Sequence, residues 1–434
     1  MSITMTTVIL FAVFGVLLFL GVPISISIVA SSIVTAMSTL SWDQITFITM
    51  QKMNSGVESF SLLAVPLFIL AGNIMNNGGI AKRLVNFAQL FVGKIPGSMA
   101  QANILGNMLF GALSGSSVAA ASAMGGCISP IEEENGYDPA YSAAANIASA
   151  PTGLLIPPTS AFIVYSTVAG GVSISTLFMA GYIPGIIWAL CCCVVGVLLA
   201  VKLGYKGTPG KFDWKNLGVC TLRALPSLSL IIVVIGGIIG GVFSATEGSA
   251  IAVVYALVLA FCYRSINLKS LWKIIVDSAK MSGMVVFLVG VSNILGWVMA
   301  FLQIPDAVAA ALLSLTSNKY VILLIMNVIL LVSGTFMDVT PAILIFTPLF
   351  LPICQSFGMS TIQFGLILVY NLCIGNITPP VGNALFVGIK VGRTSLSKVM
   401  PYMLMYYVAI IGGLLLVTFI PAVSIALPQA MGLM

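Results

Sequence analysis

Two segments of the chain place a Pro-Pro pair inside stretches that are too apolar for surface loops. Residues 146–159 contain Pro157-Pro158, and residues 370–381 contain Pro379-Pro380. Proline has no backbone N–H and clashes with the preceding turn, so each pair is expected to break a helix. In lipid, such a break is stable only where protein or a water-filled cavity solvates the freed backbone groups. We therefore expect both breaks to lie inside the protein.

The composition places these breaks in a membrane. Of 434 residues, 59% are hydrophobic and only 6% are charged, with a mean hydropathy of +1.15, whereas soluble domains have roughly 25% charged residues. At about 20 residues per crossing, the apolar length suffices for roughly ten or more spans. The predicted fold class is an all-α polytopic membrane protein. The net charge of +6 is ascribed to Lys and Arg kept at the cytoplasmic side, not to nucleic-acid binding.

The order of apolar runs gives a topology. The runs lie at about 5–21, 24–40, 60–78, 98–130, 138–169, 174–201, 227–245, 248–263, 281–302, 320–355, 361–389 and 401–424. Three basic amphipathic stretches between them are expected to lie along the interface: 79–94, 211–223 and 267–280. Two runs have polar centres, and we interpret them as re-entrant hairpins that do not cross. Then 15 of the 17 basic residues fall inside, leaving only Lys52 and Lys319 outside, and both termini are periplasmic.

The second half of the sequence is an internal repeat of the first. A shift of 222 residues aligns Gly153 with Gly375 and each Pro-Pro pair with the other. Upstream, a shift of 219 aligns Ser114-Gly115 with Ser333-Gly334, which implies three extra residues at the second hairpin. Because the two hairpins enter from opposite sides, the repeats are predicted to be inverted about an axis in the membrane plane. Matched breaks in such repeats are typical of the binding site of a secondary transporter.

Each hairpin is predicted to meet the broken helix of its own repeat. The tips read Ser114-Gly-Ser-Ser117 and Ser333-Gly-Thr335, the latter followed by Asp338. Unwound carbonyls and helix C-termini suit Na⁺, and half-helix N-termini suit an anion. Asp338 is the only ionisable side chain of the predicted site, and no Lys or Arg lies there. An anion would then need co-bound cations, for which oxygen-rich breaks favour Na⁺. Without His, a proton relay is the weaker option.

The candidate substrate-binding residues carry hydroxyl, amide or carboxylate groups: Ser116, Ser117, Thr152, Thr335, Asp338 and Asn376. Other interpretations remain open. The Ser-Gly-Ser-Ser tip could be a small-residue packing seam, each Pro-Pro pair a simple kink, and Asp338 a helix cap. Glu247 is interpreted as the cap of a span, and residues 132–134, all Glu, as a solvated cytoplasmic turn.

Several motifs in order resemble the large membrane subunit of tripartite ATP-independent periplasmic (TRAP) transporters, the DctM-like family. The motifs are Pro66–Met75, Gly78–Ala81, Phe110–Val118, Gly136–Ala140, Ile156–Pro158, Gly241–Glu247, Gly334–Asp338 and Thr378–Gly382. The resemblance covers essentially the whole chain. The chain departs from the commonest pattern at residues 132–134, where basic or neutral residues are more usual, and at Ser244-Ala245.

The resemblance implies an elevator-type, Na⁺-coupled importer of an organic acid in the bacterial inner membrane, with at least two Na⁺ ions co-transported. It also implies a small membrane subunit of the DctQ type and a periplasmic substrate-binding protein as partners. The first Na⁺ site would comprise Ser114, Gly115, Gly153 and Thr159, and the second Gly334, Gly375, Thr378 and Val381. The form of residues 374–382 resembles sugar-acid members, including sialic acid transporters, more than C4-dicarboxylate ones.

On this basis the chain divides into five parts. They are N-terminal scaffold spans with an arm (1–95), a first transport-domain repeat (96–172, with hairpin 96–130 and broken helix 138–169), central scaffold spans with arms (173–303), a second repeat (304–395, with hairpin 320–355 and broken helix 361–389) and a C-terminal span (396–434). Two other transport functions remain open: a stand-alone Na⁺/dicarboxylate symporter and a channel. An intramembrane enzyme would need a nucleophile–base pair or a metal cluster, and the sequence offers neither, so no enzymatic activity is expected.

Overall fold

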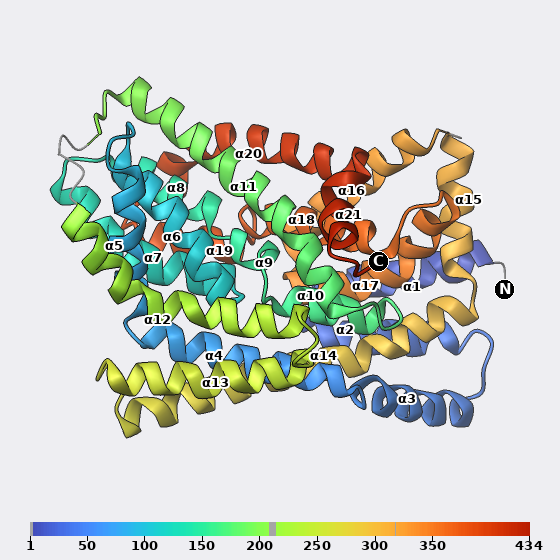
Figure 1. The fold of residues 1–434 in the computed structure, drawn as a ribbon. Coiled ribbons are helices and arrows are strands. Elements are labelled where there is room, and N and C mark those ends of the chain that lie inside the picture. The colour runs from blue at the N-terminus through green and yellow to red at the C-terminus, as the bar shows by residue number, and fades with distance from the viewer. Residues whose placement is uncertain (1–2, 208–213, 317) are drawn as a thin grey trace.

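A computed structural model describes residues 3–207, 214–316 and 318–434 (Figure 1). Every regular element in this part of the chain is a helix. In chain order these are α1 (Ile3–Phe19), α2 (Ile24–Ala36), α3 (Trp42–Val57), the 3₁₀ turn η1 (Phe60–Leu63), α4 (Ala64–Asn77), α5 (Ile80–Val92), α6 (Ser98–Ser114), α7 (Ser117–Glu134), α8 (Pro139–Ser149), α9 (Thr152–Leu155), α10 (Ser160–Val168), α11 (Ile174–Leu203), α12 (Trp214–Ile239), α13 (Ala245–Cys262), α14 (Leu268–Phe301), α15 (Ile304–Leu315), α16 (Lys319–Phe336), α17 (Val339–Ser356), α18 (Thr361–Asn376), α19 (Asn383–Val391), α20 (Leu396–Phe419) and α21 (Pro421–Ala430). Residues 211–213, which open one predicted interfacial stretch, lie outside the described residues.

The helices confirm a polytopic membrane protein. Seven helices of the described residues are long and apolar enough to cross a membrane, or eight if the bent pair α8–α10 counts as one span. α11 shows how such a span meets lipid: Leu190, Val194 and Leu198 recur every four residues and are exposed. A row at this spacing forms one apolar face of a helix, which suits contact with hydrocarbon.

Several helices differ from the predicted runs, and α12 joins the described part of the predicted arm 211–223 to the following span in one helix. α3 and α15 were not among the predicted runs, and α14 joins the expected arm 267–280 to the span 281–302 in one helix of 34 residues. α3 escapes a search for apolar runs because it is amphipathic and starts at a capping box of Ser41 and Gln44. α14 is continuous because Asn267 caps its start and no proline interrupts it.

Helix boundaries recur at one offset in the two halves. α7 and α17 begin at Ser117 and Val339, and α11 and α20 begin at Ile174 and Leu396, in each case 222 positions apart. The first helices of the two hairpins, α6 and α16, end at Ser114 and Phe336, again 222 apart. The expected three-residue insertion in the second hairpin is therefore wrong. In Figure 1, α6 and α7 lie in the left half of the view, whereas α16 and α17 lie in the right half.

Both predicted helix breaks are present. After α9 the chain is extended around Pro157-Pro158, and α10 leaves at 46° to the preceding segment. The second break separates α18 from α19 across Pro379-Pro380, and both Pro-Pro bonds are cis. Proline has no backbone N–H to donate, so helical hydrogen bonding stops at each Pro-Pro pair, as the sequence predicts.

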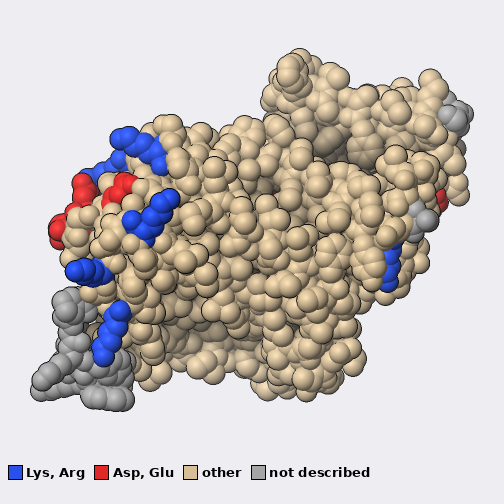
Figure 2. Space-filling view, turned by 90° about the horizontal axis from the view of Figure 1, so that it is seen from above, with Lys and Arg blue, Asp and Glu red and all other residues tan. Residues whose placement is uncertain are grey.

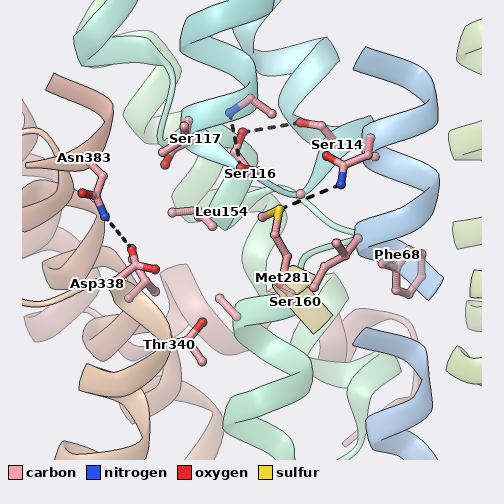
Figure 3. Close-up of a pocket in the computed structure, with 18 of the residues that line it drawn as sticks. Phe68, Ser114, Ser116, Ser117, Leu154, Ser160, Met281, Asp338, Thr340 and Asn383 are labelled. Atoms are coloured by element: carbon pink, nitrogen blue, oxygen red, sulfur yellow. Dashed lines mark hydrogen bonds between the residues drawn. The ribbon is translucent and has the colours of Figure 1, made fainter. Parts of the chain in front are cut away.

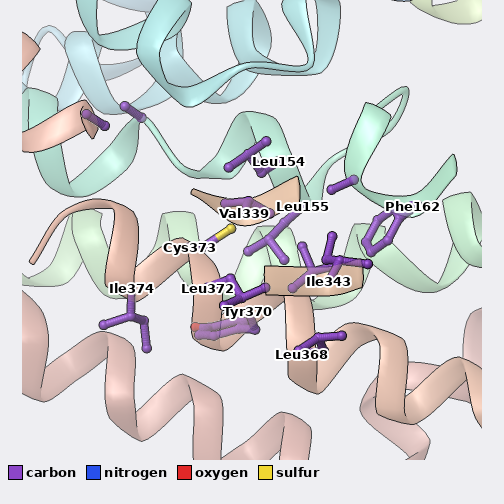
Figure 4. Packing of buried hydrophobic residues seen from close by; sticks show 14 of the residues in the cluster. Leu154, Leu155, Phe162, Val339, Ile343, Leu368, Tyr370, Leu372, Cys373 and Ile374 are labelled. Carbon is purple, nitrogen blue, oxygen red and sulfur yellow. The ribbon is translucent and has the colours of Figure 1, made fainter. Parts of the chain in front are cut away.

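The two repeats share one apolar core (Figure 4). Leu154 and Leu155 of α9 pack with Ile343 of α17 and with the row on α18 that ends in Leu372 and Cys373. Each repeat packs a half-helix against the other repeat: α10 of the first repeat packs on α17 and α18, and α19 of the second repeat packs on α7 and α8. Lipid tails are as apolar as these side chains, so close van der Waals packing rather than exclusion from water holds the core together.

The acidic run 132–134 departs from its predicted role as a solvated turn. It is the last turn of α7, and although Glu133 and Glu134 are exposed, Glu132 is 1% exposed. Successive helical residues point about 100° apart, so three consecutive side chains cannot all face water once a neighbouring helix covers one side.

On the face shown in Figure 2, most charged side chains gather at one end. In Figure 2 most of the visible Lys and Arg residues lie at the left end, beside several Asp and Glu residues, and the long middle of the surface is uncharged. This is the distribution that a protein spanning a bilayer requires, because charged groups must stay out of the hydrocarbon.

Candidate functional site

The tip of the first hairpin is a tight reversal built on one glycine. α6 ends at Ser114, and Gly115 takes φ +61°, a conformation that glycine adopts without a steric penalty. Ser116 then caps α7, its hydroxyl accepting a hydrogen bond from the Ala119 amide at 3.3 Å. A Cβ on Gly115 would lie 3.0 Å from the carbonyl oxygen of Pro158. The tip is thus packed against the break of its own repeat, as the sequence predicts.

Glycine pairs bring hairpin and break into backbone contact in both repeats. A Cβ added to Gly153 would lie 2.6 Å from the Cα of Gly111, and one added to Gly375 would lie 2.3 Å from the carbonyl carbon of Gly334. No side chain fits at either crossing. The Val381 amide also donates to the Thr335 carbonyl at 3.2 Å, which ties the second break to its hairpin.

The second tip lies further along the chain than predicted. α16 continues through Phe336, so Ser333-Gly-Thr335 forms its last turn, and the reversal is made by Met337 and Asp338. The backbone contact of Gly334 with Gly375 is made from within the helix. Asp338 occupies the N-cap position of α17, but its carboxylate makes no capping hydrogen bond. It accepts instead from the Asn383 amide at 3.4 Å.

Asn376 links the two repeats. Its Nδ2 donates to the Ser117 hydroxyl of the first hairpin at 3.2 Å, and its Oδ1 accepts from the Ala384 amide at 2.9 Å across its own break. Nearby, the Cys373 thiol lies 3.9 Å from the carbonyl oxygen of Pro151, the residue 222 positions earlier. The two hairpin–break units are therefore joined at their centre.

A cavity of about 410 Å³ opens where these units meet (Figure 3). Its lining comes from both repeats and from α4 and α14: Phe68, Ile69, Gly72, Asn73, Asn76, Ser114–Ala119, Ser122, Leu154, Ser160, Ala161, Met281, Val285, Asp338, Val339, Thr340, Asn376 and Asn383. This volume is within the usual range of small-molecule sites.

Four helix N-termini face this cavity. The lining includes the first residue of α7, α10, α17 and α19, namely Ser117, Ser160, Val339 and Asn383. The first backbone N–H groups of each helix have no partner within the helix, and each N-terminus carries the positive end of a helix dipole. The arrangement can therefore attract an anion without a cationic side chain. Asp338 is the only ionisable residue of this lining.

Six of the fourteen predicted site residues line this cavity. Ser116, Ser117, Asp338 and Asn376 line the cavity, as do Ser114 and Gly115. Thr152 and Thr335 are not part of this lining, and their hydroxyls donate to the backbone carbonyls of Ser149 and Val332. The remaining predicted Na⁺ ligands lie at the hairpin–break contacts around the cavity: Gly153, Thr159, Gly334, Gly375, Thr378 and Val381.

Sequence reasoning missed the wall supplied by α4 and α14. Asn73 donates to the Ser278 hydroxyl at 2.9 Å and lies 3.9 Å from the sulfur of Met281, which joins these two helices at the cavity. The sequence spacing of these residues does not predict a contact between Asn73 and residues more than 200 positions away. The signal that could have been used is polar side chains, Asn73 and Asn76, inside the apolar run 60–78.

Comparison with known proteins gives the family. Residues 11–423 match the family model described as "Tripartite ATP-independent periplasmic transporter, DctM component". The chain belongs to the DctM family of TRAP transporters. It is a transporter permease and not an enzyme, as the sequence predicts.

Relatives of this TRAP permease cover almost its whole length. It is 49% identical to the uncharacterized protein YgiK of Salmonella typhimurium over 97% of each chain. It is 37% identical to the C4-dicarboxylate TRAP transporter large permease protein DctM of Pseudomonas aeruginosa, over 87% of this chain and 88% of that one. It is 32% identical to the sialic acid TRAP transporter large permease protein SiaM of Vibrio cholerae, over 95% and 96%.

The fold is also similar to a solved transporter structure. The YdaH transporter of Alcanivorax borkumensis superimposes with a TM-score of 0.63 at 14% identity, covering 91% of this chain and 90% of that one. At this identity the likeness concerns the fold alone. The glycine crossings and the cavity of the TRAP permease therefore have to be interpreted from its own residues.

Proposed function

We propose that this TRAP permease imports an organic acid anion by Na⁺-coupled secondary transport. The observation that carries the proposal is the cavity onto which four helix N-termini open, with no Lys or Arg in its lining. Helix dipoles attract the anion, and because they carry only partial charges they leave part of its charge uncompensated. Co-bound cations complete the compensation.

Na⁺ is the cation that fits the hairpin–break contacts. At the Gly111–Gly153 and Gly334–Gly375 crossings, the atoms nearest to Gly153 and Gly375 are backbone atoms of the partner glycine, including its carbonyl oxygen. Hard oxygen ligands favour Na⁺ over softer metals. We assign one ion to the first contact, with Ser114, Gly115, Gly153 and Thr159, and one to the second, with Gly334, Gly375, Thr378 and Val381.

For the substrate we favour a sugar acid, such as sialic acid, over a C4-dicarboxylate. The cavity lining is rich in hydroxyl and amide groups, among them Ser116, Asn376 and Asn383, which match a substrate with many hydroxyls. A dicarboxylate would bring a second negative charge that the described lining does not compensate with any cationic side chain.

The proposed cycle is an elevator movement. The two repeats share one core, so hairpins and broken helices can move as a unit against α4 and α14, which form the opposite wall of the cavity. We propose that the repeats are inverted in the bacterial inner membrane, with both termini periplasmic. A small membrane subunit would extend the fixed part, and a periplasmic binding protein would deliver the substrate.

Reconstitution tests this function. The permease is placed in liposomes with its small subunit, and uptake of radiolabelled sialic acid is measured with and without an inward Na⁺ gradient and a cognate binding protein. The proposal requires both for uptake. Na⁺-driven uptake without the binding protein would identify a stand-alone symporter instead, and passive flux without either would identify a channel.

A further inference from the structure

Glu132 is a buried carboxylate whose oxygens have no hydrogen-bond partner among the described residues. It lies in the last turn of α7, away from the main cavity, and 1% of its surface is exposed. Burying an ionised carboxylate without a partner is strongly unfavourable, so such a group takes up a proton. Glu133, the next residue, is exposed and has no such constraint.

No described side chain around Glu132 forms an ion pair with it. The titratable and charged residues on the surrounding elements, where the structure describes their side chains, include Arg83 on α5, Glu133 and Glu134 on α7, Tyr137, Asp138 and Tyr141 at the start of α8, Lys202 on α11 and Tyr205 after it, Lys390 on α19 and Arg393 after it, and Lys398, Tyr402 and Tyr406 on α20. Arg83 instead lies over the ring of Tyr263, 3.6 Å from its centre.

Most of the nearby hydroxyls are engaged elsewhere. Tyr141 donates to the Gly196 carbonyl at 2.9 Å, and Tyr402 donates to the Asp138 carboxylate at 2.7 Å. The Tyr205 hydroxyl accepts from the Asp138 amide at 2.7 Å. The Tyr406 hydroxyl has no hydrogen-bond partner in the described part of the chain, so it too leaves the charge of Glu132 uncompensated.

A second cavity lies close to Glu132. Ser142 of α8 interacts with the carboxylate, yet its buried hydroxyl makes no hydrogen bond of ordinary geometry. Ser142 also lines this second cavity, of about 140 Å³, between α7, α8 and the end of α19. At about 30 Å³ per molecule, this space holds roughly four waters. The exposed Glu133 and the residue Arg393 belong to the same lining.

We propose that Glu132 is a proton-binding site, loaded from water through the cavity at Ser142. The step is a simple protonation: a carboxylate oxygen gains one proton from water and returns it on deprotonation. Burial raises the pKa of Glu132 to about 8, and Ser142 opposes the rise. A metal cation is a poorer occupant, since it needs more oxygen ligands than one carboxylate and one hydroxyl. The proposal does not depend on Na⁺ coupling.

Proton binding has a defined effect on stability. The folded pKa of about 8 lies above the ordinary value of 4.5. The stabilisation by the neutral form is therefore complete below pH 4.5 and is lost as the pH rises toward 8. For a chain of this size we expect Tm to fall on the order of 1–2 °C per pH unit in that window.

The test compares the intact permease complex with its Glu132→Gln and Glu133→Gln variants. Tm is measured from pH 5 to pH 9 in potassium buffers without Na⁺. The wild type and Glu133→Gln should lose stability with rising pH, and Glu132→Gln should lose markedly less. Equal pH profiles in all three would overturn the proposal. Recovery of the wild-type Tm at pH 9 by NaCl, absent in Glu132→Gln, would instead identify a Na⁺ site and also overturn it.

Infrared spectroscopy of the wild type gives a second measurement that does not need a folded variant. A protonated carboxylic acid has its own carbonyl stretching band, and ordinary carboxylates are ionised at pH 7. We expect one such band at pH 7 that disappears with a midpoint near pH 8. Absence of the band at pH 7 would show that Glu132 carries no proton and would refute the site.

Discussion

The backbone contact between Gly334 and Gly375 predicts the effect of a single methyl group. In Gly375→Ala the new Cβ would lie 2.3 Å from the carbonyl carbon of Gly334 and 2.5 Å from its Cα and oxygen. Ordinary van der Waals contact begins at 3.4 Å, so α16 and α18 must separate by about 1 Å. Overpacking of this kind costs about 1–3 kcal/mol.

The same movement disturbs the proposed second Na⁺ site. The hydrogen bond from the Val381 amide to the Thr335 carbonyl is already 3.2 Å long. About 1 Å of added separation would take it beyond hydrogen-bond distance. Carbonyl oxygens that face the break would shift by a similar amount. We expect Na⁺-driven uptake to fall at least tenfold, which corresponds to about 1.4 kcal/mol.

The assay is uptake in proteoliposomes across a series of Na⁺ concentrations, together with Tm of the purified protein. Gly412→Ala is the matched control, because a Cβ there has no atom within 4 Å and the position lies in the interior of α20. It should transport normally, with equal or slightly higher stability. Wild-type uptake and an unchanged half-saturating Na⁺ concentration in Gly375→Ala would refute the contact and the site built on it.

Three further outcomes are expected. Asn376→Ala should abolish uptake with membrane expression intact, because it removes the side chain that bonds Ser117 and bridges the second break; normal uptake would contradict its place in the site. Ser116→Ala should also abolish uptake and lower stability by about 1 kcal/mol through loss of the α7 cap, measured as uptake and Tm. Single cysteines at positions 96 and 358, at the open ends of the two hairpins, should react with a membrane-impermeant thiol reagent from opposite sides. Reaction from one side would exclude inverted repeats.

Much of the site could be predicted because its determinants are local. Proline lacks a donor wherever it stands, so the breaks at Pro157-Pro158 and Pro379-Pro380 follow from the sequence alone. The reversal at Gly115 is similarly local, since positive φ favours glycine. The capping box of Ser244 and Glu247 confirms the predicted cap for the same reason.

Errors arose where one residue depends on a distant one. The sequence predicts the tip of the second hairpin too early in the chain because Ser333-Gly334 resembles Ser114-Gly115, yet Gly334 forms a helix crossing with Gly375 and not a turn. The direction that a helical side chain faces is equally invisible without the neighbouring helix. The sequence predicts a solvated turn at Glu132, but α8 packs against α7 and Glu132 is buried.

The sequence by itself determined that this is a membrane protein with two broken helices and two hairpins, because hydropathy and proline act within a few residues. Only the tertiary structure decided which atoms meet. The bond between Asn376 and Ser117 joins positions 259 residues apart, and α4 and α14 close the cavity from outside both repeats. Such contacts depend on how the helices pack and on which face of each helix points inward. No single segment of the sequence determines either property.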